Sequence, residues 1–317
     1  MFNNTLGASS DVLNPHLGAS WDIMQTRLEN EGPPPTPVLQ TAFASYAFRD
    51  IFGTGQDVVE LFNTGTSAEQ NFSAAELSSS AYTTFAASNT IRITTWHNQT
   101  ENGTGLDLAQ STTNNMPKWE AAATDTDKYA ATESPSMFTY SRMINTTSSA
   151  VTDEFDGTDK ETTIIAVAKS NNYYVPSPDS LLFGLNENSG TYASARTNRT
   201  IGVLGATSGD PVGYFACDNS NSDTELSGGE SLQSSYKIYI ATDTGNARTF
   251  YRDGSSQQAN TVDLGAQSYH NLYLASTGDG YTSNYVQSKI CELHIFNRIL
   301  TADEIAEANT ALAALYQ

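Results

Sequence analysis

The sequence predicts an all-β protein: a two-sheet sandwich with short helices and a C-terminal helix, preceded by an extended N-terminal arm. Three observations lead to this prediction. Short runs rich in β-branched and aromatic residues recur along the chain, separated by clusters of turn-forming residues. The last of these runs leads into a capped helix with one apolar stripe. Residues 1–32 differ in composition from everything that follows.

The strand-like runs begin at residue 91 and recur along the rest of the chain. The predicted strands are Ile91–Trp96, Thr162–Ala168, Leu181–Leu185, Ile201–Leu204, Val212–Cys217, Tyr236–Ala241, Thr249–Tyr251 and Asn271–Ala275. Two segments, Ala42–Phe52 and Ser73–Phe85, are predicted to be short helices packed before the first central strand. The segment 121–150 is polar and rich in Thr and Ser, which predicts an insertion or a long loop.

The C-terminus has the most specific local pattern. Residues 291–296 alternate at period two, and both faces of this predicted strand are partly apolar. Thr301 is a good helix N-cap, and Glu304, three residues later, completes a capping box. One face of the following helix is apolar, which predicts that the helix lies on a sheet. The residues of that stripe are Ile305, Ala308, Leu312 and Leu315.

Composition limits the partners. Of the 317 residues only 15 are Lys or Arg, and the formal net charge is -20. Such a surface repels phosphate backbones and anionic lipids, so we expect no nucleic-acid binding. No apolar run reaches the ~18 residues of a membrane span, and no signal peptide is recognisable, so we expect no membrane insertion.

The two cysteines, Cys217 and Cys291, are too few for a disulfide framework. Each is expected to be a small buried hydrophobic residue, or the two form one disulfide.

Residues 1–38 are predicted to be a docking arm with a Pro-rich spacer, and residues 39–317 to be the sandwich domain. The sequence Leu-Gly-Ala-Ser occurs twice in the arm, and Pro33–Pro37 favours a stiff polyproline spacer. The apolar side chains of the arm are too sparse to form a core, so we expect them to dock on a partner. These docking residues are Phe2, Leu6, Leu13, Leu17 and Trp21.

Several segments together resemble a known family. They are Thr41–Ile51, Phe72–Phe85, Ile91–Gly103 and Asn115–Pro117, with the closing strand and helix. They are similar to the concanavalin A-like, laminin-G-type jelly roll found in bacteriophage virion proteins and related to the catalytic sandwich of fungal B-type arabinofuranosidases. The family's tyrosine-aspartate pair after tryptophan is His97-Asn98 in this chain, and its arginine-rich strand is Val58–Phe62. The resemblance implies a jelly-roll fold.

The function we expected from this resemblance is a non-enzymatic bacteriophage virion protein, a tail-fibre or baseplate appendage or a capsid decoration, for adhesion to host glycans or particle stabilisation. Its partners would be other virion proteins, reached through the arm, and host surface glycans. It would be a homo-oligomer, made in the host cytoplasm and located in the virion. The alternatives are a glycoside hydrolase of the arabinofuranosidase type and a free carbohydrate-binding module. No catalytic residue is predicted, because Glu292–Phe296 lacks two of the three acids of a glucanase strand.

Two candidate sites follow from residue type. Flat aromatic rings bind the apolar faces of sugars, so Trp96, His97, Asn98 and Trp119 are a candidate glycan-binding set. The alternative is that both tryptophans are core residues. Asp153, Asp156 and Asp159 lie in the densest acidic segment, and calcium prefers oxygen ligands. The alternative there is a solvated turn, and no other cofactor is expected.

Overall fold

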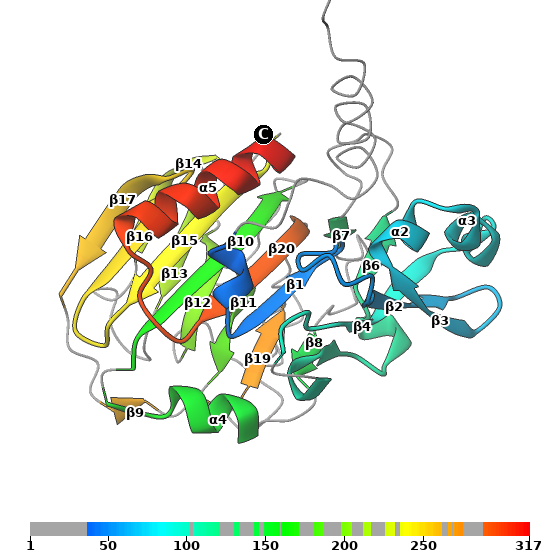
Figure 1. Cartoon of the computed structure of the whole chain (residues 1–317), viewed down its shortest axis with the longest axis horizontal. Coiled ribbons are helices and arrows are strands. Elements are labelled where there is room, and N and C mark those ends of the chain that lie inside the picture. Colours follow the sequence, from blue (N-terminus) through cyan, green and yellow to red (C-terminus); the bar gives the residue numbers. More distant parts are fainter. Residues whose placement is uncertain are drawn as a thin grey trace, which may run out of the picture. The chain divides into compact units, whose positions relative to one another are not determined.

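The computed structural model describes residues 37–101, 104–120, 130–132, 143–145, 149–158, 160–170, 180–186, 198–204, 212–216, 226–231, 235–261, 266–267, 269, 271–274 and 288–317. The fold is an all-β sandwich with a C-terminal helix, as predicted (Figure 1). The strands are β1 (Ala44–Ala47), β2 (Asp57–Asn63), β3 (Ala68–Ser73), β4 (Ile91–Trp96), β5 (Leu108–Ala109), β6 (Lys118–Glu120), β7 (Ala130–Thr132), β8 (Met143–Asn145), β9 (Gly157–Thr158), β10 (Thr162–Ser170), β11 (Ser180–Asn186), β12 (Asn198–Leu204), β13 (Val212–Ala216), β14 (Leu226–Ser231), β15 (Lys237–Asp243), β16 (Arg248–Arg252), β17 (Ser255–Asn260), β18 (Ala266–Gln267), β19 (Asn271–Leu274) and β20 (Ser288–Phe296). The helices are α2 (Ala74–Leu77), α3 (Ser80–Ala86), α4 (Ser149–Phe155) and α5 (Ala302–Tyr316), with 3-10 turns η1 (Leu39–Thr41), η2 (Thr104–Leu106) and η3 (Thr113–Asn115).

The strands pair antiparallel in two series. The first sheet runs β17-β16-β15-β10-β20-β1. The second runs β14-β13-β12-β11-β19-β8-β5-β4-β2-β3. The short strands β6 and β7 join the two sheets, because β6 pairs with β4 and β7 pairs with β20. A small β9-β18 pair is separate.

Each face of the first sheet buries its own set of apolar side chains. Inward residues such as Tyr46, Ile164 and Leu293 pack in the main core, together with second-sheet residues such as Leu61 and Phe183. The outward residues of the first sheet form a second core with α5, which lies over this sheet at β15 in Figure 1. That core includes Ala47, Ile165, Val167, Ile240, Ile305, Ala308, Leu312 and Tyr316. No helix in the described part of the chain has the length and hydropathy needed to cross a membrane.

Most of the predicted strands are confirmed to within a few residues, and Ser73–Phe85 does contain short helices, α2 and α3. The predicted helix Ala42–Phe52 is wrong: this segment contains strand β1. Its backbone pairs with β20, with Tyr46 opposite Leu293, and pairing outweighs the weak helical preference of its alanines. The segment 121–150 is not entirely loop, because its described residues include β7, β8 and the first two residues of α4.

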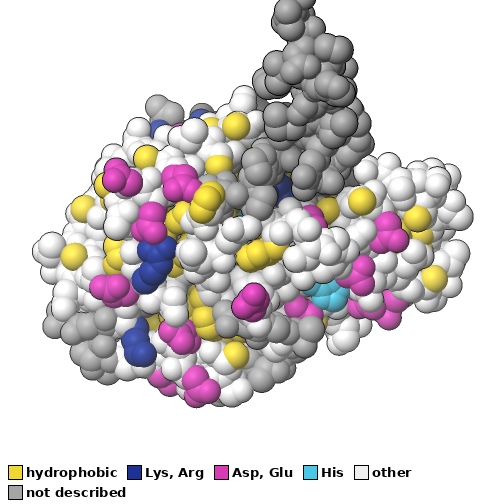
Figure 2. Space-filling model, in the orientation of Figure 1, with side chains coloured by type: hydrophobic (Ala, Val, Ile, Leu, Met, Phe, Trp, Pro, Cys, Tyr) yellow, Lys and Arg dark blue, Asp and Glu magenta, His cyan; other side chains and the backbone are white. Residues whose placement is uncertain are grey.

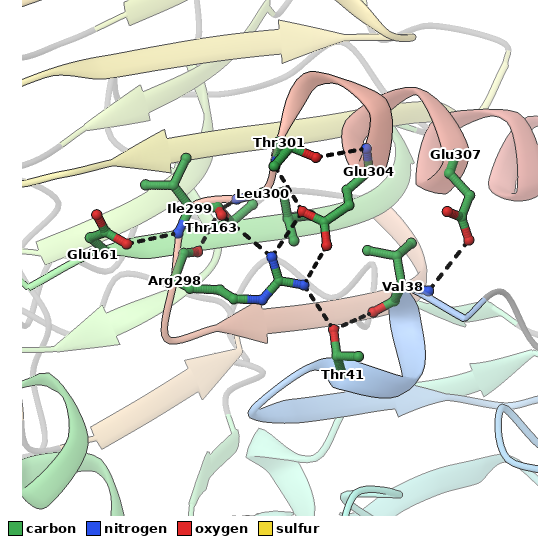
Figure 3. Close-up of polar contacts among 10 residues, drawn as sticks. All are labelled: Val38, Thr41, Glu161, Thr163, Arg298, Ile299, Leu300, Thr301, Glu304 and Glu307. Carbon is green, nitrogen blue, oxygen red and sulfur yellow. Dashed lines mark hydrogen bonds and ion pairs between the residues drawn. The ribbon is translucent and has the colours of Figure 1, made fainter.

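Helix α5 begins as its sequence predicts. The Thr301 hydroxyl accepts from the Glu304 backbone N–H, and the Glu304 carboxylate accepts from the Thr301 N–H at 2.8 Å. Arg298 binds both Glu304 oxygens, at 2.9 and 2.7 Å, and also donates to the Thr41 hydroxyl at 3.0 Å (Figure 3). The hydrogen bonds from Arg298 and Thr301 lower the pKa of Glu304 to about 2. Arg298 therefore links Glu304, in the first turn of α5, to Thr41 of η1.

Helix α5 also contacts Val38, the residue that precedes η1. Val38 is buried in the second core, and its N–H meets the Glu307 carboxylate at 3.4 Å (Figure 3). A truncation that removes the arm should therefore end before Val38. The arm residues Phe2, Leu6, Leu13, Leu17 and Trp21 lie outside the described residues, so docking through them stays a prediction.

The capping box supports a first prediction. Replacing Thr301 by Ala leaves an N-terminal N–H of α5 without its side-chain acceptor, and we expect a loss of about 1 kcal/mol in the free energy of unfolding. Urea denaturation followed by circular dichroism would measure it. Thr310→Ala is the matched control, because Thr310 lies in the same helix but is exposed and its hydroxyl only donates to the Ala306 carbonyl. Equal effects of the two substitutions would contradict a capping role.

Candidate functional site

The segment after β4 crosses from the second sheet to the first. Asn98 accepts the N–H of Ser45 through its side-chain oxygen at 2.9 Å. Gln99 accepts from the Ile51 N–H at 2.9 Å, and Thr100 donates to the Phe43 carbonyl at 3.0 Å. All three of these polar side chains are buried. They satisfy backbone groups of β1 and of the residues on either side of it, so Asn98 has a structural role here.

His97 precedes this buried segment, and its imidazole is held on both sides. Its Nδ1 lies 3.0 Å from Oδ2 of Asp107, and its Nε2 lies 2.9 Å from Oδ1 of Asn71. The other oxygen of Asp107 accepts from the Asn98 N–H at 2.8 Å. The side chain of Asp107 is 8% exposed and that of His97 is 21% exposed. A buried carboxylate thus orients a histidine whose ring reaches the surface.

Further polar groups lie beside His97. Glu60 of β2 pairs across the sheet with Asn71 of β3 and with Thr95 of β4. One oxygen of Glu60 accepts from the hydroxyls of Thr94 and Thr95, each at 3.0 Å. We refer to Glu60, Asn71, Thr95, His97 and Asp107 as the His97 face. Figure 2 shows histidine next to acidic side chains at this end of the molecule.

The two tryptophans of the candidate glycan-binding set are core residues. Trp96 is 0% exposed and Trp119 is 3% exposed. Trp96 stacks on Phe48, with ring centroids 4.5 Å apart and an interplanar angle of 4°, and Trp119 meets the same Phe48 ring edge-on at 4.7 Å. Neither ring face is open to a sugar. Glycan binding at this place stays a prediction, and it now depends on the partly exposed His97 rather than on the aromatic rings.

The acidic segment does not converge on a metal in the described residues. Asp153 is exposed on α4, whereas Asp156 accepts the Tyr269 N–H at 2.6 Å. Asp159 lies outside the described residues. Within the ranges that the structure describes, no group of three or more His, Cys, Asp or Glu side chains is placed to hold a metal ion. Asp156 has instead a structural contact, from the end of α4 to the segment before β19.

A second polar cluster, which the sequence patterns did not predict, lies beneath α5. Glu292 of β20 is fully buried and receives four hydrogen bonds. Two come from the Arg49 guanidinium, one from Nε2 of His294 at 3.0 Å and one from the Tyr316 hydroxyl at 2.7 Å. Nδ1 of His294 lies 2.9 Å from the Ser45 hydroxyl. We call Ser45, Arg49, Glu292, His294 and Tyr316 the Glu292 cluster.

Electrostatics explains why this cluster is tolerated. Burial raises the pKa of Glu292, but Arg49 and His294 outweigh burial and lower that pKa to about 2. Burial and the nearby Glu292 raise the pKa of Tyr316 well above its usual value, so its hydroxyl stays a donor. The carboxylate is therefore ionised and fully hydrogen-bonded, as a buried charge requires. The available sequence signal was a Glu and a His within an otherwise apolar strand.

A bulge helps to assemble this cluster. Along β20, Val167 of β10 is paired with Glu292, but the next residue, Ala168, is paired with Ile290. Cys291 is the extra residue, and it joins the core beneath α5. The period-two alternation predicted for residues 291–296 therefore holds only from Glu292 onward. Cys291 is in no disulfide, and Cys217 lies outside the described residues.

Comparison with known proteins finds likeness in fold only. No protein-family model and no curated protein sequence matches the chain. Among solved structures, a glutamate-to-glutamine mutant of a GH54 α-L-arabinofuranosidase, soaked with 4-nitrophenyl α-L-arabinofuranoside, has a TM-score of 0.68 at 16% identity. A GH54 α-L-arabinofuranosidase soaked with a cyclic sulfate inhibitor has a TM-score of 0.67 at 17% sequence identity. An arabinofuranosidase complexed with arabinofuranosyl-α-1,2-xylobiose has a TM-score of 0.65 at 16% sequence identity. Each match covers 90% of this chain and 66% of the other.

These findings correct the function expected from the sequence. The expectation of a non-enzymatic bacteriophage virion protein was wrong, because the similar folds named above are those of glycoside hydrolases. The virion location and the virion partners were inferred from that function and are untested. The relation in fold to the arabinofuranosidases, which the segments around residues 41–119 indicated, is confirmed.

Proposed function

We propose that the chain is a glycoside hydrolase of the arabinofuranosidase type. One observation carries the proposal: the likeness in fold to arabinofuranosidases extends over 90% of the chain, at TM-scores of 0.65 to 0.68. Two of those structures hold arabinofuranosides, so the substrate class we propose is an α-L-arabinofuranoside. Two further parts of this proposal are a concanavalin A-like classification, which depends on the sequence resemblance, and docking through residues 1–38, which depends on their composition.

The His97 face is the place where we propose that the glycan is bound. Sugar hydroxyls need donors and acceptors that are exposed and held in place. Asn71 is exposed, and Glu60 and His97 are partly exposed; each of the three is fixed by at least one hydrogen bond. Hydrolysis of a glycoside requires carboxyl groups, and Glu60 and Asp107 are the carboxylates of this face. Asp107 is fully engaged by His97 and Asn98, which makes Glu60 the first carboxylate to test.

The test is hydrolysis of 4-nitrophenyl α-L-arabinofuranoside and of arabinoxylan oligosaccharides by the whole chain. We expect release of 4-nitrophenol and arabinose above the uncatalysed rate, and a loss of at least about 100-fold in Glu60→Gln, since removing one catalytic carboxylate costs orders of magnitude in rate. Asp303→Asn, an exposed carboxylate in the first turn of α5, is the control and should keep full activity. No release from any arabinofuranoside would contradict the proposed function, and full activity of Glu60→Gln would place the chemistry away from the His97 face.

A further inference from the structure

The Glu292 cluster and the His97 face are joined by hydrogen bonds. The cluster provides the first part of this connection. The Tyr316 hydroxyl of α5 donates to Oε1 of Glu292 at 2.7 Å, and Oε2 of Glu292 meets Nε2 of His294 at 3.0 Å. Nδ1 of His294 meets the Ser45 hydroxyl at 2.9 Å. Glu292, His294 and Ser45 are each 0% exposed.

Ser45 also begins the second part, through its backbone. Its N–H donates to Oδ1 of Asn98 at 2.9 Å, and the Asn98 N–H donates to Oδ1 of Asp107 at 2.8 Å. Oδ2 of Asp107 meets Nδ1 of His97 at 3.0 Å. The connection therefore crosses the molecule from α5, through β20 and β1, to the end of β4 (Figure 1). Only its last member, His97, is substantially exposed.

The direction of the bonds to Glu292 follows from chemistry. An ionised carboxylate can only accept, so His294 donates to Glu292 through Nε2–H. The other ring nitrogen, Nδ1, lies 2.9 Å from the Ser45 hydroxyl, which can either donate or accept a hydrogen bond. No side-chain nitrogen or oxygen of Tyr316, Glu292, His294 or Ser45 is buried without a hydrogen-bond partner.

We propose that Glu292, His294 and Ser45 are positioning residues for His97. In a dry interior a group that loses its partner cannot take water instead, so it moves or pulls on the next group in the network. Loss of the Tyr316 hydroxyl should therefore shift the side chains of Glu292 and His294 and, through them, Ser45. Movement of Ser45 should in turn shift Asn98 and the Asp107 carboxylate that orients His97. This inference rests on the proposed function only for the role of the His97 face; the connection itself is a property of the fold.

The experiment is nitrogen-15 NMR of the histidine side chains in the full chain at fixed pH. The chain has 4 histidines, so the ring-nitrogen resonances can be assigned by substitution. We expect His294→Gln and Tyr316→Phe each to change the His97 ring-nitrogen shifts and the population of its Nδ1–H tautomer. Thr163→Val is the control. It removes a buried hydroxyl that contacts Arg298 and Leu300 beneath the start of α5, off the connection, and should leave His97 unchanged.

Two outcomes would overturn the proposal. One is a His97 spectrum identical to wild type in both variants while their folds are intact, and the other is an equal change in Thr163→Val. If His294→Gln does not fold, Ser45→Ala and Tyr316→Phe, which each remove one hydroxyl, decide the question. Because the spectrum requires no substrate, its result is independent of whether arabinofuranosides are hydrolysed.

Discussion

Replacing Glu292 by Ala is expected to cost about 3 to 5 kcal/mol of unfolding free energy, because it leaves the Arg49 guanidinium buried without its counter-charge. Arg49 is only 7% exposed, and both of its hydrogen bonds to Glu292 would be lost. The substitution also removes the acceptor of the Tyr316 hydroxyl, which holds the end of α5. Such a loss is a large part of the roughly 5 to 15 kcal/mol that stabilises most domains. Urea denaturation at neutral pH would measure it.

The matched control is the double variant Arg49→Met with Glu292→Leu, which removes both charges and keeps most of the volume. Its loss should be smaller than that of Glu292→Ala, because no unpaired charge remains. A loss below about 1 kcal/mol in Glu292→Ala itself would mean that Arg49 finds water, and the cluster would then contribute little.

The same carboxylate predicts an acid transition. The pKa of Glu292 is about 2 in the folded protein, below the ordinary value of 4.5. A carboxylate with a lowered pKa contributes stability that is complete above the unfolded value and is lost as pH falls toward the folded value. The wild type should therefore lose this contribution between about pH 4.5 and pH 2. The double variant lacks the group, so its stability should fall less over that interval.

Replacing Trp96 by Ala is expected to cost about 3 to 5 kcal/mol, the cost of emptying a large buried side-chain site. Trp96 is 0% exposed, and the substitution removes its stacking on Phe48 as well as its contact with Tyr46. Trp96→Phe is the comparison, because it keeps an aromatic ring against Phe48 and should cost clearly less. The midpoint of urea denaturation, followed by circular dichroism, measures both.

This result also separates the two interpretations of Trp96. If Trp96 were a surface residue that stacks on a sugar, its replacement would lower the free energy of unfolding by less than about 0.5 kcal/mol and would abolish glycan binding. Tests of glycan binding should therefore use His97→Ala, since the replacement of Trp96 or Trp119 changes the core. Loss of glycan binding in His97→Ala with an unchanged unfolding curve would assign His97 to the site.

The candidate site could be predicted from the sequence only in part. His97 and Asn98 were identified as part of an aromatic glycan-binding set with Trp96 and Trp119, and of these four residues His97 does reach the surface. Of the partners that hold it, Asn71 comes from β3, which β2 separates from β4, and Asp107 comes from the segment after η2. Their pairing with His97 depends on the register of β2, β3 and β4, which no single segment determines.

What the sequence determined by itself is local. The capping box of Thr301 and Glu304 and the apolar stripe after it predicted α5, because a helix of that length carries its own start signal and its own periodicity. The period-two runs predicted the strands for the same reason. Segment Ala42–Phe52 has no such signal, and only pairing with β20 made part of it a strand. Likewise Arg49 and Glu292 are separated by 243 positions in the chain. A buried ion pair between them requires both β20 and the segment after β1 in place, because neither charge is tolerated in the interior until the tertiary structure supplies the other.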